Sequence, residues 1–187
     1  MKYSNKNSDS EIIEGCRKSN RLAQRVLYDR FFGRMYGIAM RYTSNQEEAI
    51  EILNAAFLKV FNSLDKYEDN NNLAGWIAKI VFNCAIDFVR KNTKYKQVIN
   101  FNVEQDAPIQ NDCISNLQTE DLFKLIQRLP EASRSVFCMY VIDGYKHKEI
   151  AEILDITEGT SKWHLSTARK DLQQMLERQR NFEYSSK

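Results

Sequence analysis

Apolar residues along most of the chain recur every three to four positions, the spacing of amphipathic α-helices. The predicted helices start near Asp9 and then cover about 20–42, 45–66, 73–92, 120–128, 132–142, 147–154 and 158–179. Alternating patterns typical of strands are almost absent, and only two prolines and six glycines interrupt the chain. The sequence therefore predicts an all-α protein.

The apolar positions also predict which face of each helix is buried. In the second helix these positions are Leu22, Val26, Phe31, Met35, Ile38 and Tyr42. In the helix at 45–66 they are Ile50, Leu53, Phe57, Val60, Phe61 and Leu64, with Ile52 at the flank of the opposite side. In the last helix they are Ser161, Leu165, Ala168, Leu172 and Leu176. We expect each stripe to pack on a helical core.

Polar residues at the ends of the apolar runs predict where individual helices begin. Ser44 and Glu47 have capping-box spacing, Asn72 precedes the helix at 73–92, and Thr157 precedes the last helix. Pro130 and Gly144 separate the helices between them.

Helical periodicity stops between about Tyr95 and Gln118. Ile99, Phe101 and Val103 alternate with polar residues, but a single short strand has no partner here. We therefore expect two helical domains, at 9–95 and 119–180, joined by a flexible linker at 96–118.

The net charge of +2 conceals an uneven distribution. Residues 1–97 carry sixteen basic and eleven acidic side chains, whereas residues 98–118 carry three acids and no base. A basic first half and a basic last helix are compatible with a polyanionic partner.

Cofactor and membrane signals are missing from the sequence. Cys16, Cys84, Cys113 and Cys138 have no CxxC spacing, and His147 and His164 have no ligand spacing. We expect reduced thiols and no metal or other cofactor. No signal core and no apolar run of transmembrane length is present, so we expect a cytoplasmic protein that does not insert into membranes.

The helix at 45–66 has a polar side with one large apolar residue in it. Glu47, Glu51, Asn54 and Asp65 surround an outward Leu58. This pattern fits either an ordinary solvated face or a docking face with a central apolar anchor.

The helix at 73–92 carries a narrow polar stripe followed by a basic segment. Trp76 lies close to the stripe, which consists of Lys79, Asn83, Asp87 and Arg90. Asp87 has the spacing to pair with Arg90 or Lys91 on the same helix. The basic segment is Arg90, Lys91, Lys94 and Lys96, with Tyr95 among them. Cations interleaved with an aromatic ring suit single-stranded DNA.

The segment HKEIAEILDITEGTSKWHL predicts a helix-turn-helix, whose second helix enters the major groove of DNA. The polar side of that helix contains Thr160, Lys162, Trp163, Ser166, Thr167 and Lys170. Trp163 either reaches base edges there or packs on a neighbouring segment, and both interpretations are open. Lys162 and Lys170 are candidates for phosphate contacts.

The segment from LPEASRSVF to TARKDL resembles region 4 of the extracytoplasmic-function sigma factors of bacterial RNA polymerase. The matching positions are Leu129, Pro130, Arg134, Val136, Phe137, Gly144, Glu149, Ile150, Ala151, Gly159, Thr160, Lys162, Leu165, Ala168 and Arg169. Asp155 stands where the family commonly has glycine. The segment RYTSNQEEAIEILNAAFLKVFNSLDKY resembles sigma region 2.2, and Trp76, Asn83, Asp87 and Arg90 resemble regions 2.3 and 2.4.

The resemblance implies a sigma factor with core RNA polymerase and promoter DNA as partners. Residues Glu47, Glu51, Asn54 and Leu58 would then bind polymerase. Trp76, the polar stripe and the basic segment would contact the minus-ten element, with Glu68–Leu73 as a specificity loop. The helix beginning near Gly159 would read the minus-thirty-five element. An anti-sigma factor is a further implied partner, and no catalytic residues are implied.

Two other functions remain compatible with the residues alone. One is a helix-turn-helix regulator that binds duplex DNA without polymerase. The other is a helical adaptor or small enzyme with a metal on Glu47, Glu48 and Glu51, although these lack partners from other helices.

Overall fold

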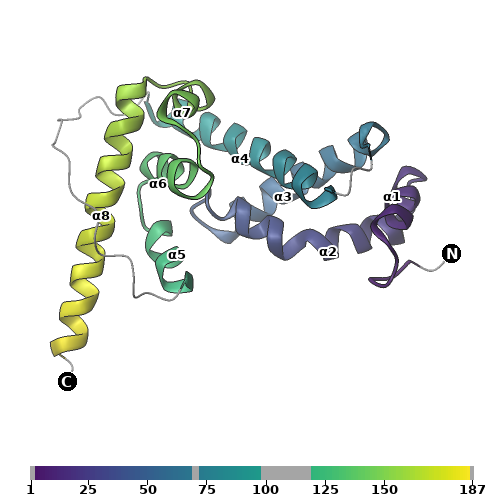
Figure 1. Cartoon of the computed structure of the whole chain (residues 1–187), viewed down its shortest axis with the longest axis horizontal. Coiled ribbons are helices and arrows are strands. Elements are labelled where there is room, and N and C mark those ends of the chain that lie inside the picture. The colour runs from purple at the N-terminus through teal and green to yellow at the C-terminus, as the bar shows by residue number, and fades with distance from the viewer. Residues whose placement is uncertain (1–2, 69–71, 98–118, 186–187) are drawn as a thin grey trace. The chain divides into compact units, whose positions relative to one another are not determined.

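The computed structural model describes residues 3–68, 72–97 and 119–185, with side chains described except at 93–97, 119–121 and 180–185. Every regular element in these ranges is a helix (Figure 1), which confirms the all-α prediction. The elements are α1 (Asp9–Arg17), α2 (Arg21–Ala39), α3 (Gln46–Ser63), η1 (Leu64–Lys66), α4 (Leu73–Gln97), α5 (Thr119–Gln127), α6 (Glu131–Phe137), η2 (Cys138–Ile142), α7 (His147–Leu154) and α8 (Glu158–Ser185). Their contacts form two compact units, Met1–Phe88 and Val89–Lys187.

Helices α1 and α2 approach each other closely at two small residues. A Cβ placed on Gly15 would lie only 2.6 Å from the Cβ of Ala23, so the contact requires glycine there. The buried face of α2 is accordingly Ala23, Leu27, Phe31, Met35 and Ala39. The predicted face was wrong at its first position, because Leu22 is 52% exposed. Val26 and Ile38 are half-buried.

The buried face of α3 also differs from the predicted one. Its buried residues are Ala49, Ile52, Leu53, Ala56, Phe57 and Val60. Ile50 is exposed and Phe61 only half-buried, whereas Ile52, placed by the sequence at the flank of the polar side, is buried. The helix packs through its alanines, and this rotates Ile50 outward.

The predicted cap of α3 is displaced by one residue. Asn45, rather than Ser44, is the N-cap, and its Oδ1 accepts a hydrogen bond from Glu48 N at 2.9 Å. The Glu48 carboxylate accepts a second hydrogen bond from the backbone N–H of Ser44, one residue before the cap, at 2.8 Å.

Helix α4 begins as predicted and ends later. Asn72 Oδ1 accepts a hydrogen bond from Gly75 N at 3.1 Å, which confirms the predicted cap. The helix continues to Gln97, past the predicted end at residue 92, and includes the first two residues assigned to the linker. The rest of that linker, including Cys113 and the alternating segment at 99–103, lies outside the described residues.

In the second unit, α6 and α7 pack against α8, and Figure 1 shows both helices beside it. The predicted stripe of α8 is confirmed, because Ser161, Leu165, Ala168, Leu172 and Leu176 are all buried. Between α6 and α7, η2 is a π-helical turn that ends before Gly144, whose φ is +77°. Arg134 of α6 is buried, and its Nη1 donates to the carbonyl of Gln127 at 2.9 Å.

Three cysteines lie in the described part of the chain. Cys16, Cys84 and Cys138 are buried free thiols, as predicted for them. Burial raises the pKa of Cys16 to about 11, so its thiol stays protonated and unreactive at neutral pH. Among the described helices, none combines the length and apolar character needed to cross a bilayer.

Candidate functional site

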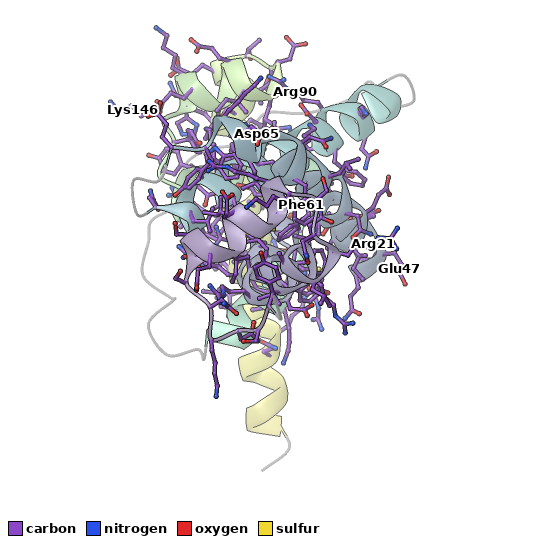
Figure 2. The ribbon with its side chains drawn as sticks, turned by 90° about the vertical axis from the view of Figure 1, so that its right-hand side faces the viewer. Arg21, Glu47, Phe61, Asp65, Arg90 and Lys146 are labelled. Atoms are coloured by element: carbon purple, nitrogen blue, oxygen red, sulfur yellow. The ribbon has the colours of Figure 1, made fainter. Side chains whose placement is uncertain are left out.

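The outward side of α3 carries the first group of candidate residues. Glu47, Glu51, Asn54 and Leu58 are all exposed, and Leu58 is 62% exposed. Figure 2 shows the Glu47 side chain projecting outward from the start of α3. The structure therefore confirms that these side chains share an accessible surface.

A shallow surface hollow joins these candidates to two residues that the sequence did not select. It is lined by Glu47, Ile50, Glu51, Asn54, Ala55 and Leu58. Ile50 is 42% exposed and gives the hollow a second large apolar side chain. Ala49, Ile52 and Ala56 also have the spacing of one buried helix face. Choosing that face from the sequence would have predicted that Ile50 is exposed.

Neighbouring aromatic residues hold the polar side of this hollow in place. The hydroxyl of Tyr28 in α2 lies 3.4 Å from Asn54 Oδ1. The Tyr28 ring also packs on the Phe57 ring, with 4.6 Å between centroids. Two apolar anchors within a rim of carboxylates and an amide form a surface suited to another protein.

The acidic residues of α3 do not converge with ligands from other helices. Within the described ranges, no group of three His, Cys, Asp or Glu side chains is arranged to hold a metal ion. The Glu48 carboxylate instead accepts a hydrogen bond from the backbone N–H of Ser44, which precedes the Asn45 cap of α3.

The polar stripe of α4 is accessible at the predicted positions. Lys79, Asn83 and Asp87 are exposed, and Arg90 is half-buried. The Lys79 ammonium lies 5.3 Å from the centroid of the Phe82 ring. Asp87 does not pair along its own helix as its spacing suggested, because Lys59 Nζ of α3 lies 3.6 Å from its Oδ2.

The basic segment continues on the same helix. Lys91 is exposed, and residues 94 and 96 lie within the helical range of α4. The side chains of Lys94 and Lys96 are outside the described set.

A polar hollow lies beside the start of α4. Its lining residues are Lys66, Tyr67, Glu68, Asn72, Gly75 and Trp76. The rings of Tyr67 and Trp76 pack with 5.0 Å between centroids. A Cβ at Gly75 would lie 2.4 Å from Asn72 Oδ1, so glycine is needed for the cap that forms this wall.

The second unit contains the predicted helix-turn-helix, formed by α7, a short turn and α8. Asp155 at the end of α7 has φ +58° and ψ +47°, the left-handed conformation that its position requires. Thr157 Oγ1 accepts a hydrogen bond from Thr160 N at 3.0 Å and begins α8, as predicted.

The first turns of α8 present the candidate DNA-reading side chains. Thr160, Trp163, Ser166 and Thr167 are half-buried, and Lys162 and Lys170 are exposed. Trp163 is thus partly accessible, and its ring centroid lies 4.8 Å from that of His164. Lys162 Nζ also pairs with Glu158 at 2.8 Å.

Two histidines of the helix-turn-helix lie within hydrogen-bonding distance of serine hydroxyls. His147 Nδ1 lies 3.0 Å from Ser161 Oγ, and His164 Nδ1 lies 3.1 Å from Ser133 Oγ. Burial lowers the pKa of both histidines, and the nearby Lys162 lowers the pKa of His147 further. Both rings are therefore neutral structural groups near pH 7.

Comparisons with known proteins bear on both units. The family described as Sigma-70 region 2 matches residues 27–95, and the family described as Sigma-70, region 4 matches residues 119–172. ECF RNA polymerase sigma factor SigW of Bacillus subtilis is 25% identical over 181 residues, which cover 88% of this chain and 94% of SigW. The ECF sigma-E factor of Escherichia coli K12 is 22% identical over 175 residues, covering 87% and 91%.

The chain is also similar to a solved structure. It is that of the sigma factor RpoE in complex with the anti-sigma factor NepR from Bartonella quintana. It is 22% identical, has a TM-score of 0.47, and covers 80% of this chain and 94% of that chain.

A helix-turn-helix unit together with a second helical unit that matches region 2 defines a transcription initiation factor. The chain belongs to the sigma-70 family, as an extracytoplasmic-function (ECF) sigma factor. It binds core RNA polymerase and directs the enzyme to promoters.

Proposed function

We propose that the outward face of α3 is where this sigma factor binds core RNA polymerase. The observation that carries the proposal is Leu58, which is 62% exposed within a hollow rimmed by Glu47, Glu51 and Asn54. Exposed leucine inside a polar ring has the composition of an interface centre. Ile50 joins Leu58 as a second anchor in this assignment.

The minus-ten element binds along α4 in this proposal. Trp76, Lys79, Asn83 and Asp87 offer a ring and hydrogen-bonding groups on one accessible stripe, followed by the basic segment. The hollow beside Tyr67 and Trp76 is also lined by Glu68 and Asn72. These belong to the Glu68–Leu73 loop, which acts as the specificity loop and whose residues 69–71 lie outside the described residues. Cations follow the DNA backbone there, while rings and amides meet unstacked bases.

The minus-thirty-five element binds the first turns of α8. Trp163 and Thr167 contact bases in the major groove, together with Thr160 and Ser166, and Lys162 and Lys170 contact phosphates. Support comes from the helix-turn-helix geometry and from the partial exposure of the Trp163 ring. Residues 9–95 and 119–180 are then the two functional domains, with 96–118 between them.

Three further assignments follow from this function. The chain performs no catalysis of its own, because polymerase supplies the chemistry. It acts in the cytoplasm, where polymerase transcribes the chromosome. An anti-sigma factor that covers the promoter-binding surfaces would hold it inactive, as the family resemblance implies.

The test is co-purification of the full chain with core RNA polymerase, followed by promoter opening. We expect a stoichiometric complex and fluorescence from 2-aminopurine placed in the minus-ten element when the complex opens DNA. Binding of duplex DNA by the free chain, with no polymerase complex, would instead identify a regulator that works without polymerase.

A further inference from the structure

One side chain of α1 is hydrogen-bonded to Tyr67, which lines the polar hollow beside the start of α4. Arg17, in the last turn of α1, donates from Nε and Nη2 to the carbonyl oxygen of Leu64, at 3.2 and 3.1 Å. Its Nη2 also donates to the carbonyl oxygen of Tyr67, at 2.8 Å. A single guanidinium therefore connects α1 to both ends of the segment that follows α3.

These two carbonyl oxygens lie directly after the C-terminal end of α3. Helix ends leave carbonyl oxygens without intrahelical donors, and a cation near them is also favoured by the helix dipole. Tyr67 N donates to Leu64 O at 3.1 Å, so Leu64 O accepts from both the backbone and Arg17. The planar fork of arginine suits two acceptors held at a fixed separation, which a lysine ammonium cannot match.

The contact is specific to Arg17 among the cations at the end of α1. The neighbouring Lys18 points to Glu14 instead, with 2.9 Å between Nζ and Oε1. In the described part of the chain, the hydrogen-bond acceptors of Arg17 are carbonyl oxygens and include no carboxylate.

Fixing the Tyr67 carbonyl also fixes the wall of the hollow. Tyr67 is 4% exposed, and its ring packs on Trp76 of α4. Two further lining residues are held together by the bond from Gly75 N to Asn72 Oδ1. Glu68, the next residue along the chain, is exposed and also lines the hollow. Arg17 thus determines where the chain leaves Tyr67 to begin the proposed specificity loop.

We propose that Arg17 is a positioning residue for minus-ten recognition. It acts through the Leu64 and Tyr67 carbonyls and touches no DNA itself. Arg17 also lies outside residues 27–95, which match sigma-70 region 2. The inference rests on the proposed role of the Glu68–Leu73 loop, so its test must separate the two.

The experiment uses the full chain with core polymerase and a photo-cross-linking amino acid at position 68. Three backgrounds are compared: the native residue at position 17, Arg17→Ala and Arg17→Lys. Lys18→Ala is the matched control, because it removes a neighbouring cation that does not reach the carbonyls. Cross-linked nucleotides, core affinity and initiation on promoters with single minus-ten substitutions are measured for each protein.

We expect the native protein to cross-link to one position of the minus-ten element. Arg17→Ala should spread or shift that cross-link and reduce discrimination between minus-ten sequences by about tenfold, comparable to one charge-assisted hydrogen bond. Arg17→Lys should recover part of the discrimination. Core affinity and the minus-thirty-five preference should match those of Lys18→Ala.

Two results would overturn the inference in distinguishable ways. If the native protein gives no minus-ten cross-link from position 68, the proposed loop function fails and the role of Arg17 fails with it. If the cross-link is present and Arg17→Ala leaves its position and the minus-ten preference unchanged, only the positioning role is refuted. A uniform loss of stability and initiation on all minus-ten sequences would also refute it, since that is a purely structural effect.

Discussion

Lys59 of α3 and Asp87 of α4 form an ion pair, with 3.6 Å between Nζ and Oδ2. Their side chains are 56% and 54% exposed, so the pair contributes at most about 1 kcal/mol to stability. Its importance is positional. Lys59 follows Leu58 in the proposed polymerase-binding helix, and Asp87 belongs to the proposed promoter stripe. The two helices assigned to separate tasks are therefore in direct contact within the first unit.

The first prediction concerns polymerase binding. Leu58→Glu should weaken binding to core polymerase by about 2 kcal/mol, or roughly thirtyfold in Kd, because it removes a central apolar anchor. The fold should persist, since Leu58 is already exposed. Fluorescence anisotropy with labelled sigma factor measures the affinity, and circular dichroism checks the fold.

Leu22→Glu is the matched control for this variant. Leu22 is 52% exposed on α2 and does not line the α3 hollow. Equal losses of affinity in both variants would show that the effect is not specific to the α3 face.

The second prediction concerns DNA opening. Replacing Arg90, Lys91, Lys94 and Lys96 together by alanine should reduce open-complex formation more than polymerase binding. Loss of four cation–phosphate contacts should flatten the salt dependence of promoter binding by roughly three units of log–log slope. Filter binding over a salt series measures that slope.

A control with the same change in net charge isolates the position of these cations. It replaces four exposed basic residues from the first 34 residues of the chain: Lys6, Lys18, Arg25 and Arg34. If this control flattens the salt dependence as much as the first variant does, the basic segment of α4 is not a dedicated DNA track.

The third prediction concerns the minus-thirty-five element. Trp163→Ala should cost about 1–3 kcal/mol on the preferred promoter and blur its sequence preference, because the ring is proposed to contact bases. Lys170→Ala should weaken all promoters alike, because a phosphate contact carries no base information. Binding of each variant to a library of upstream elements measures both effects.

The competing explanation for Trp163 is internal packing. In that case Trp163→Ala would lower thermal stability and leave the preference profile unchanged. The edge contact with His164 is one interaction that such a loss would involve.

The fourth prediction concerns pH. Burial lowers the pKa of His164 below its ordinary value of 6.5, so the unfolded chain takes up a proton before the folded chain does. The stability associated with neutral His164 is thus fully present above pH 6.5 and is lost as pH falls from there towards the lower folded pKa. His147 acts in the same direction, because its pKa is lowered too.

Urea unfolding of the full chain at about pH 7.5 and about pH 5.5 tests this linkage. The native protein should lose stability at the lower pH, and His164→Gln should lose less. An identical pH dependence in the two proteins would show that His164 does not titrate with folding.

The sequence predicted best where leucines repeat along one helix face and where side chains cap the helix locally. The stripe from Ser161 to Leu176 is buried throughout, and the caps at Asn72 and Thr157 are as expected. The left-handed Asp155 also agrees with its place in the helix-turn-helix.

The errors arise where helices pack through small residues. Ala23 meets Gly15, and Ala49 and Ala56 are fully buried, yet a hydrophobicity pattern gives little weight to alanine and glycine. The hydrophobicity pattern therefore predicts that Leu22 and Ile50 are buried, whereas both are exposed. The π-helical turn η2 and the contacts of Arg17 depend on tertiary structure. Neither can be predicted from the local sequence pattern.

Initiation in a reconstituted reaction tests the central claim most directly. Purified core polymerase transcribes a library of randomised upstream sequences with and without the full chain, and the transcribed templates are sequenced. We predict specific initiation only when the chain is present, from templates that share two short elements at a constant spacing. Leu58→Glu should abolish this enrichment at limiting protein, whereas Leu22→Glu should not. Initiation no greater than that of core polymerase alone, or selection of a single duplex element by the chain without polymerase, would contradict the account.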